Sequence, residues 1–171
     1  MISELKIQYI YKKSILIYII LKIDYELYFC KYKLDVMYKK LNTNFYKNVA
    51  KLFYAIAAVD KVIKEEEFTA LKKIVKKEWL TLDESEDEYS TDAAYQIEFV
   101  FEGLQFKGLD AYDCYNEFIE YKNKHSYFFT DQLNSLIMKT ADKIASSYAG
   151  KNKSELIMLA KLDLNLKTKT S

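Results

Sequence analysis

The chain has 171 residues, half of them hydrophobic and 30% charged, which is enough for one hydrophobic core and excludes wholesale disorder. It has no proline and only three glycines, which excludes turn-rich, many-stranded β folds and favours helices. The 26 basic residues are all lysine and balance 25 acidic ones. Without arginine the chain lacks the planar fork that grips phosphates and guanine edges, so we expect no nucleic-acid partner.

Residues 1–36 differ in composition from the rest, because twenty of these 36 are Ile, Tyr or Lys and the first alanine of the chain is Ala50. The longest apolar run, Ser14 to Leu21, is shorter than the about twenty residues that a membrane-spanning helix needs. Three interpretations stay open: a core or membrane-surface helix, upstream sequence before a true start at Met37, or a membrane anchor. We therefore treat 1–36 as an extension that is not native or is loosely attached, and 37–171 as the folded domain.

Residues 45–77 predict two helices joined by a corner at 59–64. Glu65, Glu66 and Glu67 open the second helix, where the positive end of the helix dipole favours carboxylates. The corner has no Gly or Pro, so its tightness must come from the packing of Val59 and Ile63. The apolar residues of both helices recur at helical spacing: Phe45, Val49, Leu52, Phe53 and Ile56, then Phe68, Leu71, Ile74, Val75 and Trp79.

Capping residues predict the other helix boundaries. The helices run from Asn42 to about Val59, from Glu65 to about Lys77, from Ser90 or Thr91 to Gly103 or Gly108, from Asp110 to Lys124, from Thr130 to Gly150, and from Asn152 onward with Glu155 completing a capping box. The last helix has so little polar face that we predict it to be central and buried; its apolar residues are Leu156, Ile157, Leu159, Ala160, Leu162 and Leu164.

The first corner carries a family resemblance. The run from Ala57 to Ile63, with Asp60 inside it and Glu67 seven residues after Asp60, resembles the TerB-like (tellurite-resistance) family, whose corner is roughly A-A-D-G-x-[IV]-x-x-x-E. Lys61 stands where that family has glycine. A weaker echo follows, because Tyr148 and Glu155 have the same separation, with tyrosine in the aspartate position.

The resemblance covers roughly Met37 to Lys167 and implies an all-α fold, a compact bundle of about six helices built from two related helical hairpins. It also implies a module linked to stress or metal-ion response, since the family is associated with acidic, metal-binding surfaces. By its motif only Asp60, Glu67 and Glu155 carry over as metal ligands. Tyr148 in place of an aspartate argues against two symmetric sites.

The residues themselves leave the acidic corner open to two interpretations. Asp60 and Glu65 to Glu67 cluster the oxygen ligands that calcium or magnesium prefers, although the EF-hand pattern is absent. Alternatively, Asp60 binds free backbone amides and the glutamates only balance the helix dipole. The loop Asp83–Glu88 holds five carboxylates, which are solvated or neutralised by a cation or a lysine-rich partner.

No residue pattern indicates catalysis. His125 lies between two predicted helices, where we expect it to be exposed, and no nucleophile setting accompanies it. Cys114 has no neighbours that would lower its thiol pKa, and Cys30 is isolated from it, so neither a disulfide nor a zinc site is supported. Free thiols and the lack of a cleavable signal peptide predict a cytoplasmic protein. Most aromatics should lie in the core, and an exposed face for a partner would be built from Tyr89, Tyr95, Tyr112, Tyr115, Tyr121 and Tyr127.

The sequence therefore predicts a non-enzymatic module that binds a divalent cation, calcium or magnesium, or a protein partner through its acidic corner and loop. No other cofactor is implied, and no oligomeric state is predicted. Tellurite itself follows from no residue of the chain. The alternative is a membrane-surface adaptor, or a protein-interaction module, attached through residues 1–36.

Overall fold

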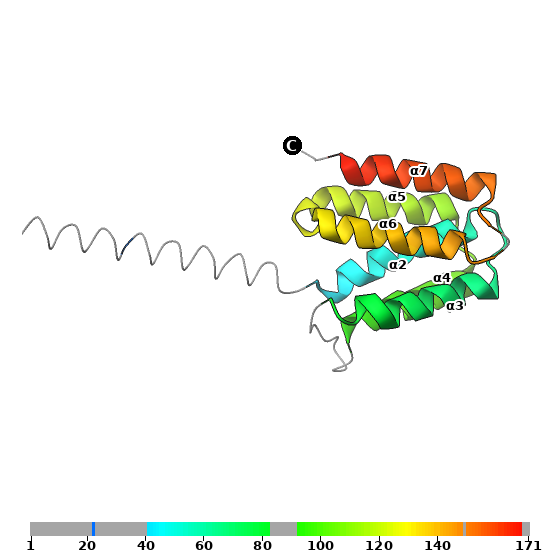
Figure 1. The fold of residues 1–171 in the computed structure, drawn as a ribbon, viewed down its shortest axis with the longest axis horizontal. Helices are drawn as coiled ribbons and strands as arrows, with labels where there is room; N and C mark the ends of the chain where they lie inside the picture. Colours follow the sequence, from blue (N-terminus) through cyan, green and yellow to red (C-terminus); the bar gives the residue numbers. More distant parts are fainter. Residues whose placement is uncertain (1–21, 23–40, 83–91, 149, 169–171) are drawn as a thin grey trace, which may run out of the picture. The chain divides into compact units, whose positions relative to one another are not determined.

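Figure 1 shows a computed structural model of the protein, which describes residues 22, 41–82, 92–148 and 150–168. The chain divides into two units, 1–40 and 41–171. Apart from Lys22, the extension 1–36 lies outside the described residues, as do Cys30, the acidic loop Asp83–Glu88 and Tyr89. The described part of the second unit holds α2 Thr43–Ala58, α3 Glu65–Ile74, α4 Gln96–Lys107, α5 Ala111–Lys124, α6 Asp131–Ala145 and α7 Lys153–Lys167. With six helices and no β-strand in these ranges, the predicted all-α bundle is confirmed.

Most of the predicted caps are confirmed. The side chains of Asn42, Asp110, Thr130 and Asn152 each accept a hydrogen bond from the backbone of the helix that follows. Gly108, with a φ of 59°, ends α4 in the left-handed conformation.

Two boundaries differ from the prediction. Asp92, rather than Ser90 or Thr91, caps a 3-10 turn that leads into α4. The helix α6 ends at Ala145, well before Gly150. The hydroxyls of Ser146 and Ser147 donate to the carbonyls of Asp142 and Ile144, both at 2.7 Å, and so satisfy the last turn early.

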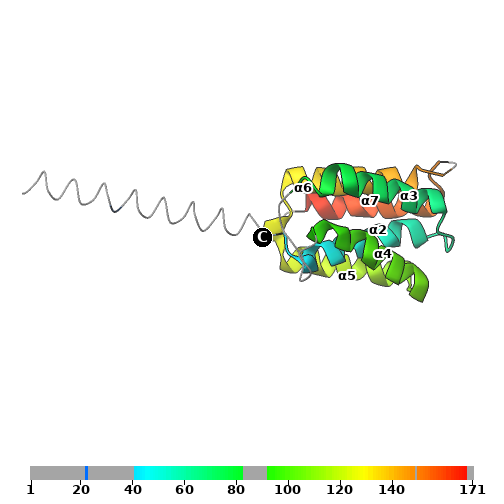
Figure 2. The same cartoon turned by 90° about the horizontal axis from the view of Figure 1, so that it is seen from below.

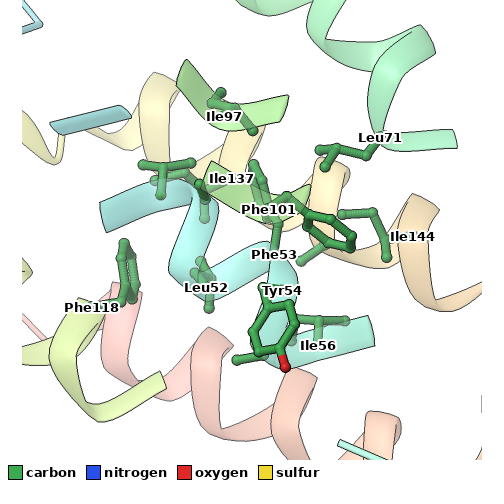
Figure 3. Close-up of a cluster of buried hydrophobic side chains, with 14 of the residues drawn as sticks. Leu52, Phe53, Tyr54, Ile56, Leu71, Ile97, Phe101, Phe118, Ile137 and Ile144 are labelled. Atoms are coloured by element: carbon green, nitrogen blue, oxygen red, sulfur yellow. The ribbon is translucent and has the colours of Figure 1, made fainter. Parts of the chain in front are cut away.

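The centre of the bundle is α2, in which eleven of sixteen residues are buried. It contacts α4, α5, α6 and α7, and Figure 2 shows α3, α6 and α7 on one side of it and α4 and α5 on the other. Its small residues, such as Ala50, Ala55 and Ala57, let neighbouring helices approach closely. In Figure 3 side chains from α3, α4, α5 and α6 gather around Leu52, Phe53 and Ile56 of α2.

The prediction that the last helix is central was wrong. The helix α7 contacts α6 and α2 and leaves Leu156, Ile157 and Leu164 between 45% and 66% exposed. An apolar composition indicates that a helix can be buried on several faces, but the number of neighbours decides how many faces are covered. Within the described ranges no helix is long and apolar enough to cross a membrane.

A π-helical turn follows α3 and ends at Trp79, which lies in the core. Residues Val75–Trp79 form a π-helical turn, in which the backbone N–H of Leu80 donates to the carbonyl of Val75. The Trp79 indole at the end of this turn is fully buried, and its Nε1 donates to the Thr140 hydroxyl of α6 at 3.1 Å. The turn therefore fastens the end of α3 to α6.

The two predicted helix pairs, α2 with α3 and α6 with α7, do pack against each other. However, α2 and α3 are not a tight hairpin, because α3 packs mainly on α6. Val59 and Ile63 are partly buried against the core, as predicted for the corner. Lys61 takes a φ of 71°, so it adopts the left-handed conformation that glycine supplies in the TerB-like pattern.

Replacing Lys61 with glycine should raise the free energy of unfolding by about 0.5 to 1 kcal/mol. Glycine adopts this φ without the Cβ clash, which costs roughly 1 to 2 kcal/mol, and the entropy of glycine in the unfolded chain offsets part of the gain. Urea unfolding followed by circular dichroism measures the difference. Lys61→Ala keeps the clash and is the matched control; equal stability of the two variants would contradict the assignment.

The central position of α2 predicts unequal costs for truncating similar side chains. Ile56→Ala should lower the free energy of unfolding by about 2 to 5 kcal/mol, because it leaves a cavity against several helices. Leu156→Ala on α7 should change it by less than about 0.5 kcal/mol, because that side chain is half exposed. If urea unfolding showed that both variants lose the same free energy of unfolding, the conclusion that α7 is peripheral would be wrong.

Candidate functional site

The candidate site is formed by two corners that lie against each other, one before α3 and one before α7. Each corner has three residues at matching positions, which we call the paired corners: Asp60, Lys64 and Glu67 in the first, and Tyr148, Asn152 and Glu155 in the second. Lys64 and Asn152 are the N-cap residues of α3 and α7. The residues that match between the two corners in sequence therefore also occupy the same positions relative to the helix that follows.

Glu67 and Glu155 make the same hydrogen bond, each at the start of its own helix. Glu67 accepts a hydrogen bond from the backbone N–H of Lys64 on its Oε2, and Glu155 accepts one from Asn152 in the same way, both at 2.8 Å. Each carboxylate thus folds back over the first turn of its helix. Both side chains are buried, at 3% and 4% exposure.

Contacts between the corners follow an approximate two-fold pattern. Asp60 accepts a hydrogen bond on its Oδ2 from the side-chain amide of Asn152 at 2.9 Å. At the matching positions, the ammonium of Lys64 lies over the ring of Tyr148, 5.1 Å from its centroid. The first residue of each corner therefore contacts the N-cap residue of the other, as in a self-complementary interface.

The carboxylates share one electrostatic environment. Burial raises the pKa of Glu67 to about 7, and the negative charges of Glu155 and Asp60 add to this, against the hydrogen bond from Lys64. The pKa of Glu155 is raised by burial and by Asp60, again against a backbone hydrogen bond. The structure thus brings together the three residues that the resemblance marked.

The three side chains do not form a ready metal cluster. Among the described residues no three carboxylate, histidine or cysteine side chains converge as metal ligands. Asp60 is exposed but engaged, since its Oδ1 accepts from Val62 N at 3.0 Å and its Oδ2 from Asn152. Glu67 and Glu155 each use Oε2 for the hydrogen bond at their own helix start, so Oε1 of each is the atom that a cation would contact. A cation here would need these two oxygens and a released Asp60.

Glu65 and Glu66 lie apart from the paired corners. Both are exposed and line an open groove between α3 and α6. The helix separates them from Glu67, because successive helical residues point about 100° apart. The cluster of four carboxylates expected at the corner is therefore split by the helix geometry.

The residues weighed for catalysis are packed into the fold. His125 is half-buried rather than exposed: its ring stacks on Tyr121 with centroids 4.2 Å apart, and its Nδ1 lies 3.0 Å from the Tyr121 carbonyl. Cys114 is buried, and burial raises the pKa of its thiol to about 11, in line with the expected lack of activation.

The tyrosines proposed for a partner surface do not form one face. Tyr115 and Tyr121 are buried, whereas Tyr112 and Tyr127 are about half exposed. The sequence analysis also missed the burial of Lys122, whose Nζ donates to the carbonyls of Asn165 at 2.7 Å and Thr168 at 3.1 Å. Its position four residues after the buried Phe118 was the available signal.

A comparison of the chain with models of protein families, with curated proteins and with solved structures found no match. The TerB-like resemblance therefore stays a prediction that depends on the residues of the two corners.

Glu67 should make stability fall as pH rises from about 4.5 to 7. Its folded pKa of about 7 lies above the ordinary 4.5, so the native state binds the proton more tightly, and that stabilisation is lost as pH passes through the folded value. Glu67→Gln should remove this fall and be more stable than the natural chain at pH 8 by about 2 kcal/mol. Urea unfolding at pH 5 and pH 8 measures it.

Glu66→Gln is the matched control, because it removes the same charge from the exposed neighbouring residue. This variant should keep the fall in stability that the natural chain shows. A Glu67→Gln variant with the full pH dependence of the natural chain would contradict the role given to Glu67.

Proposed function

We propose that this protein is a non-enzymatic, cytoplasmic, TerB-like module of a stress or metal-ion response, which binds a divalent cation at the paired corners. The observation that supports this is the approach of two buried carboxylates, Glu67 and Glu155, from different helices and beside an exposed Asp60. A function for these carboxylates is expected there, since burying like charges together is unfavourable unless a proton or a cation neutralises them.

The small number of carboxylate oxygens at the paired corners favours an ion that keeps most of its bound waters. Glu67 and Glu155 would offer one oxygen each, which is far fewer than the six to eight oxygens that calcium takes. Magnesium commonly keeps several waters and binds through one or two carboxylates. The positive ends of α3 and α7 also point at the site and weaken cation binding. We therefore expect magnesium at millimolar affinity, with calcium as the comparison.

Binding would change the surface around the corners. If Asp60 turned to the ion, it would leave Asn152, and the hydrogen bond that joins the two corners would break. Val62 and Tyr148 are about half exposed at the same corners. The affinity of a protein partner that contacts these two side chains would then depend on the bound cation. The protein would in this way bind both a cation and a protein partner, the two kinds of ligand expected from the sequence.

The alternative role as a membrane-surface adaptor depends on residues 1–36, which lie outside the described residues apart from Lys22. It stays a prediction. Chains beginning at Met1 and at Met37 should differ in liposome flotation if it holds, and equal behaviour would count against it.

Magnesium should raise the melting temperature at pH 8. A ligand that binds only the native state with a millimolar Kd stabilises it by about 1.4 kcal/mol at ten times Kd, or about 3 to 5 °C for a domain of this size. The shift should shrink at pH 6, where a proton competes for Glu67. Differential scanning calorimetry over a magnesium titration measures both effects.

The shift should be lost in the double variant Asp60→Asn with Glu67→Gln. It should persist in the matched double variant Glu65→Gln with Glu66→Gln, which removes two exposed charges from the same helix start. A shift that survives the first pair, or the absence of any shift at millimolar magnesium or calcium, would refute the cation site.

A further inference from the structure

The outer face of α7 carries an apolar stripe that is exposed in the part of the chain that the structure describes. The helix buries Met158, Leu159, Leu162 and Leu166 against the bundle. On the opposite side it exposes what we call the α7 stripe: Leu156, Ile157, Ala160 and Leu164. At 3.6 residues per turn these four side chains lie within about 60° of Ala160 and form one continuous band. Figure 1 shows α7 along the edge of the bundle.

Polar contacts at both ends hold α7 in this position. Near its start Asn152 donates to Asp60. Near its end Lys122 donates to the Asn165 carbonyl, and Asn134 donates to the carbonyl of Leu166 at 3.2 Å. The outer band is therefore displayed on a fixed helix. Single exposed apolar residues are common, but a contiguous band marks an interaction surface.

The charges around the stripe are basic. Lys153 and Lys167 lie on the same face at the two ends of the stripe, and Lys161 lies at its side; all three are exposed. Of the two acidic side chains of α7, Glu155 is buried and Asp163 forms an ion pair with Lys167 at 2.6 Å, so the unpaired positive charge of this face comes from Lys153 and Lys161. Beside the stripe, Tyr112 of α5 is about half exposed, with the Lys161 ammonium 5.6 Å from its ring.

A second copy of the chain fits this face poorly. An antiparallel pair of α7 helices centred on Ala160 would match Leu156 with Leu164 of the copy, but it would also place Lys153 against Lys167 of the copy. Like charges held together in this way oppose association.

We propose that the outer face of α7 docks onto an anionic lipid surface. The four apolar side chains enter the boundary between headgroups and acyl chains, and Lys153 and Lys161 reach the anionic headgroups. Tyr112 suits the same boundary, because its ring is apolar and its hydroxyl polar. The helix is about 22 Å long and lies in the plane of the surface.

Co-sedimentation of the full chain with vesicles tests the proposal. We expect binding to mixed phosphatidylcholine–phosphatidylglycerol vesicles, weaker binding to pure phosphatidylcholine, and loss of binding as NaCl is added. Lys153→Gln and Lys161→Gln should each reduce the partition coefficient about fivefold. The pair Leu156→Gln with Leu164→Gln should reduce it at least about tenfold. All samples contain EDTA, so the outcome does not depend on the cation site.

The chain offers a matched control on α4. Phe99 and Phe106 are also exposed, at 60% and 94%, and lie seven residues apart on one face, but the charge between them is Glu102. Phe99→Gln with Phe106→Gln should therefore leave vesicle binding unchanged. Because all these side chains are exposed, the melting temperatures of the variants should match that of the natural chain, which separates lost docking from lost folding.

Three results would overturn the proposal. The first is no binding of the full chain to anionic vesicles. The second is binding that the Leu156→Gln with Leu164→Gln pair leaves intact, as attachment through residues 1–36 alone would give. The third is a dimer in analytical ultracentrifugation that this pair abolishes, which would make a second copy the occupant.

Discussion

The fold depends on the burial of α2 on nearly all sides. Burying a helix completely requires several neighbouring helices, and α2 obtains them from α4, α5, α6 and α7. Each aliphatic or aromatic side chain so enclosed contributes roughly 1.5 to 3 kcal/mol of transfer free energy. The helices that surround α2 are each buried on one face, so their outer faces are free for other roles. The paired corners and the α7 stripe are both consequences of this arrangement.

The paired corners show how a local motif acquires a tertiary role. A glutamate three residues after a helix N-cap satisfies an amide of its own helix start, and the chain uses this twice, at Glu67 and Glu155. Either glutamate alone would be a structural cap. Because the two helix starts adjoin, the charges of Glu155 and Asp60 add to the burial that raises the pKa of Glu67, and Asp60 does the same for Glu155.

The corners and the stripe differ in the forces they use. At the corners, burial raises the pKa of Glu67 to about 7, so the charge there changes with pH, and the cation that we propose would act on the same carboxylates. On α7, exposed leucines and lysines have no such dependence, and their attraction to an anionic surface varies mainly with salt. The first feature suits sensing and the second suits attachment. A module that senses at one end of the bundle and attaches through its outermost helix would combine the two classes of partner expected from the sequence.

The sequence by itself determined the local structure. The helix starts at Asn42, Asp110, Thr130 and Asn152 were predictable because a cap depends on a side chain and the amides a few residues away. The equal spacing within the two corners also marked Asp60, Glu67 and Glu155. The all-α class followed from the lack of proline and the scarcity of glycine.

Tertiary structure decided which helix is central, and it chose the alanine-containing α2 over the leucine-rich α7. It also decided that Lys122 is buried, and that the start of α3 with Glu67 lies beside the start of α7 with Glu155. These outcomes depend on which helices become neighbours. Contacts between residues far apart in the chain set that choice, and helical periodicity in one sequence reports only which side of a helix is apolar.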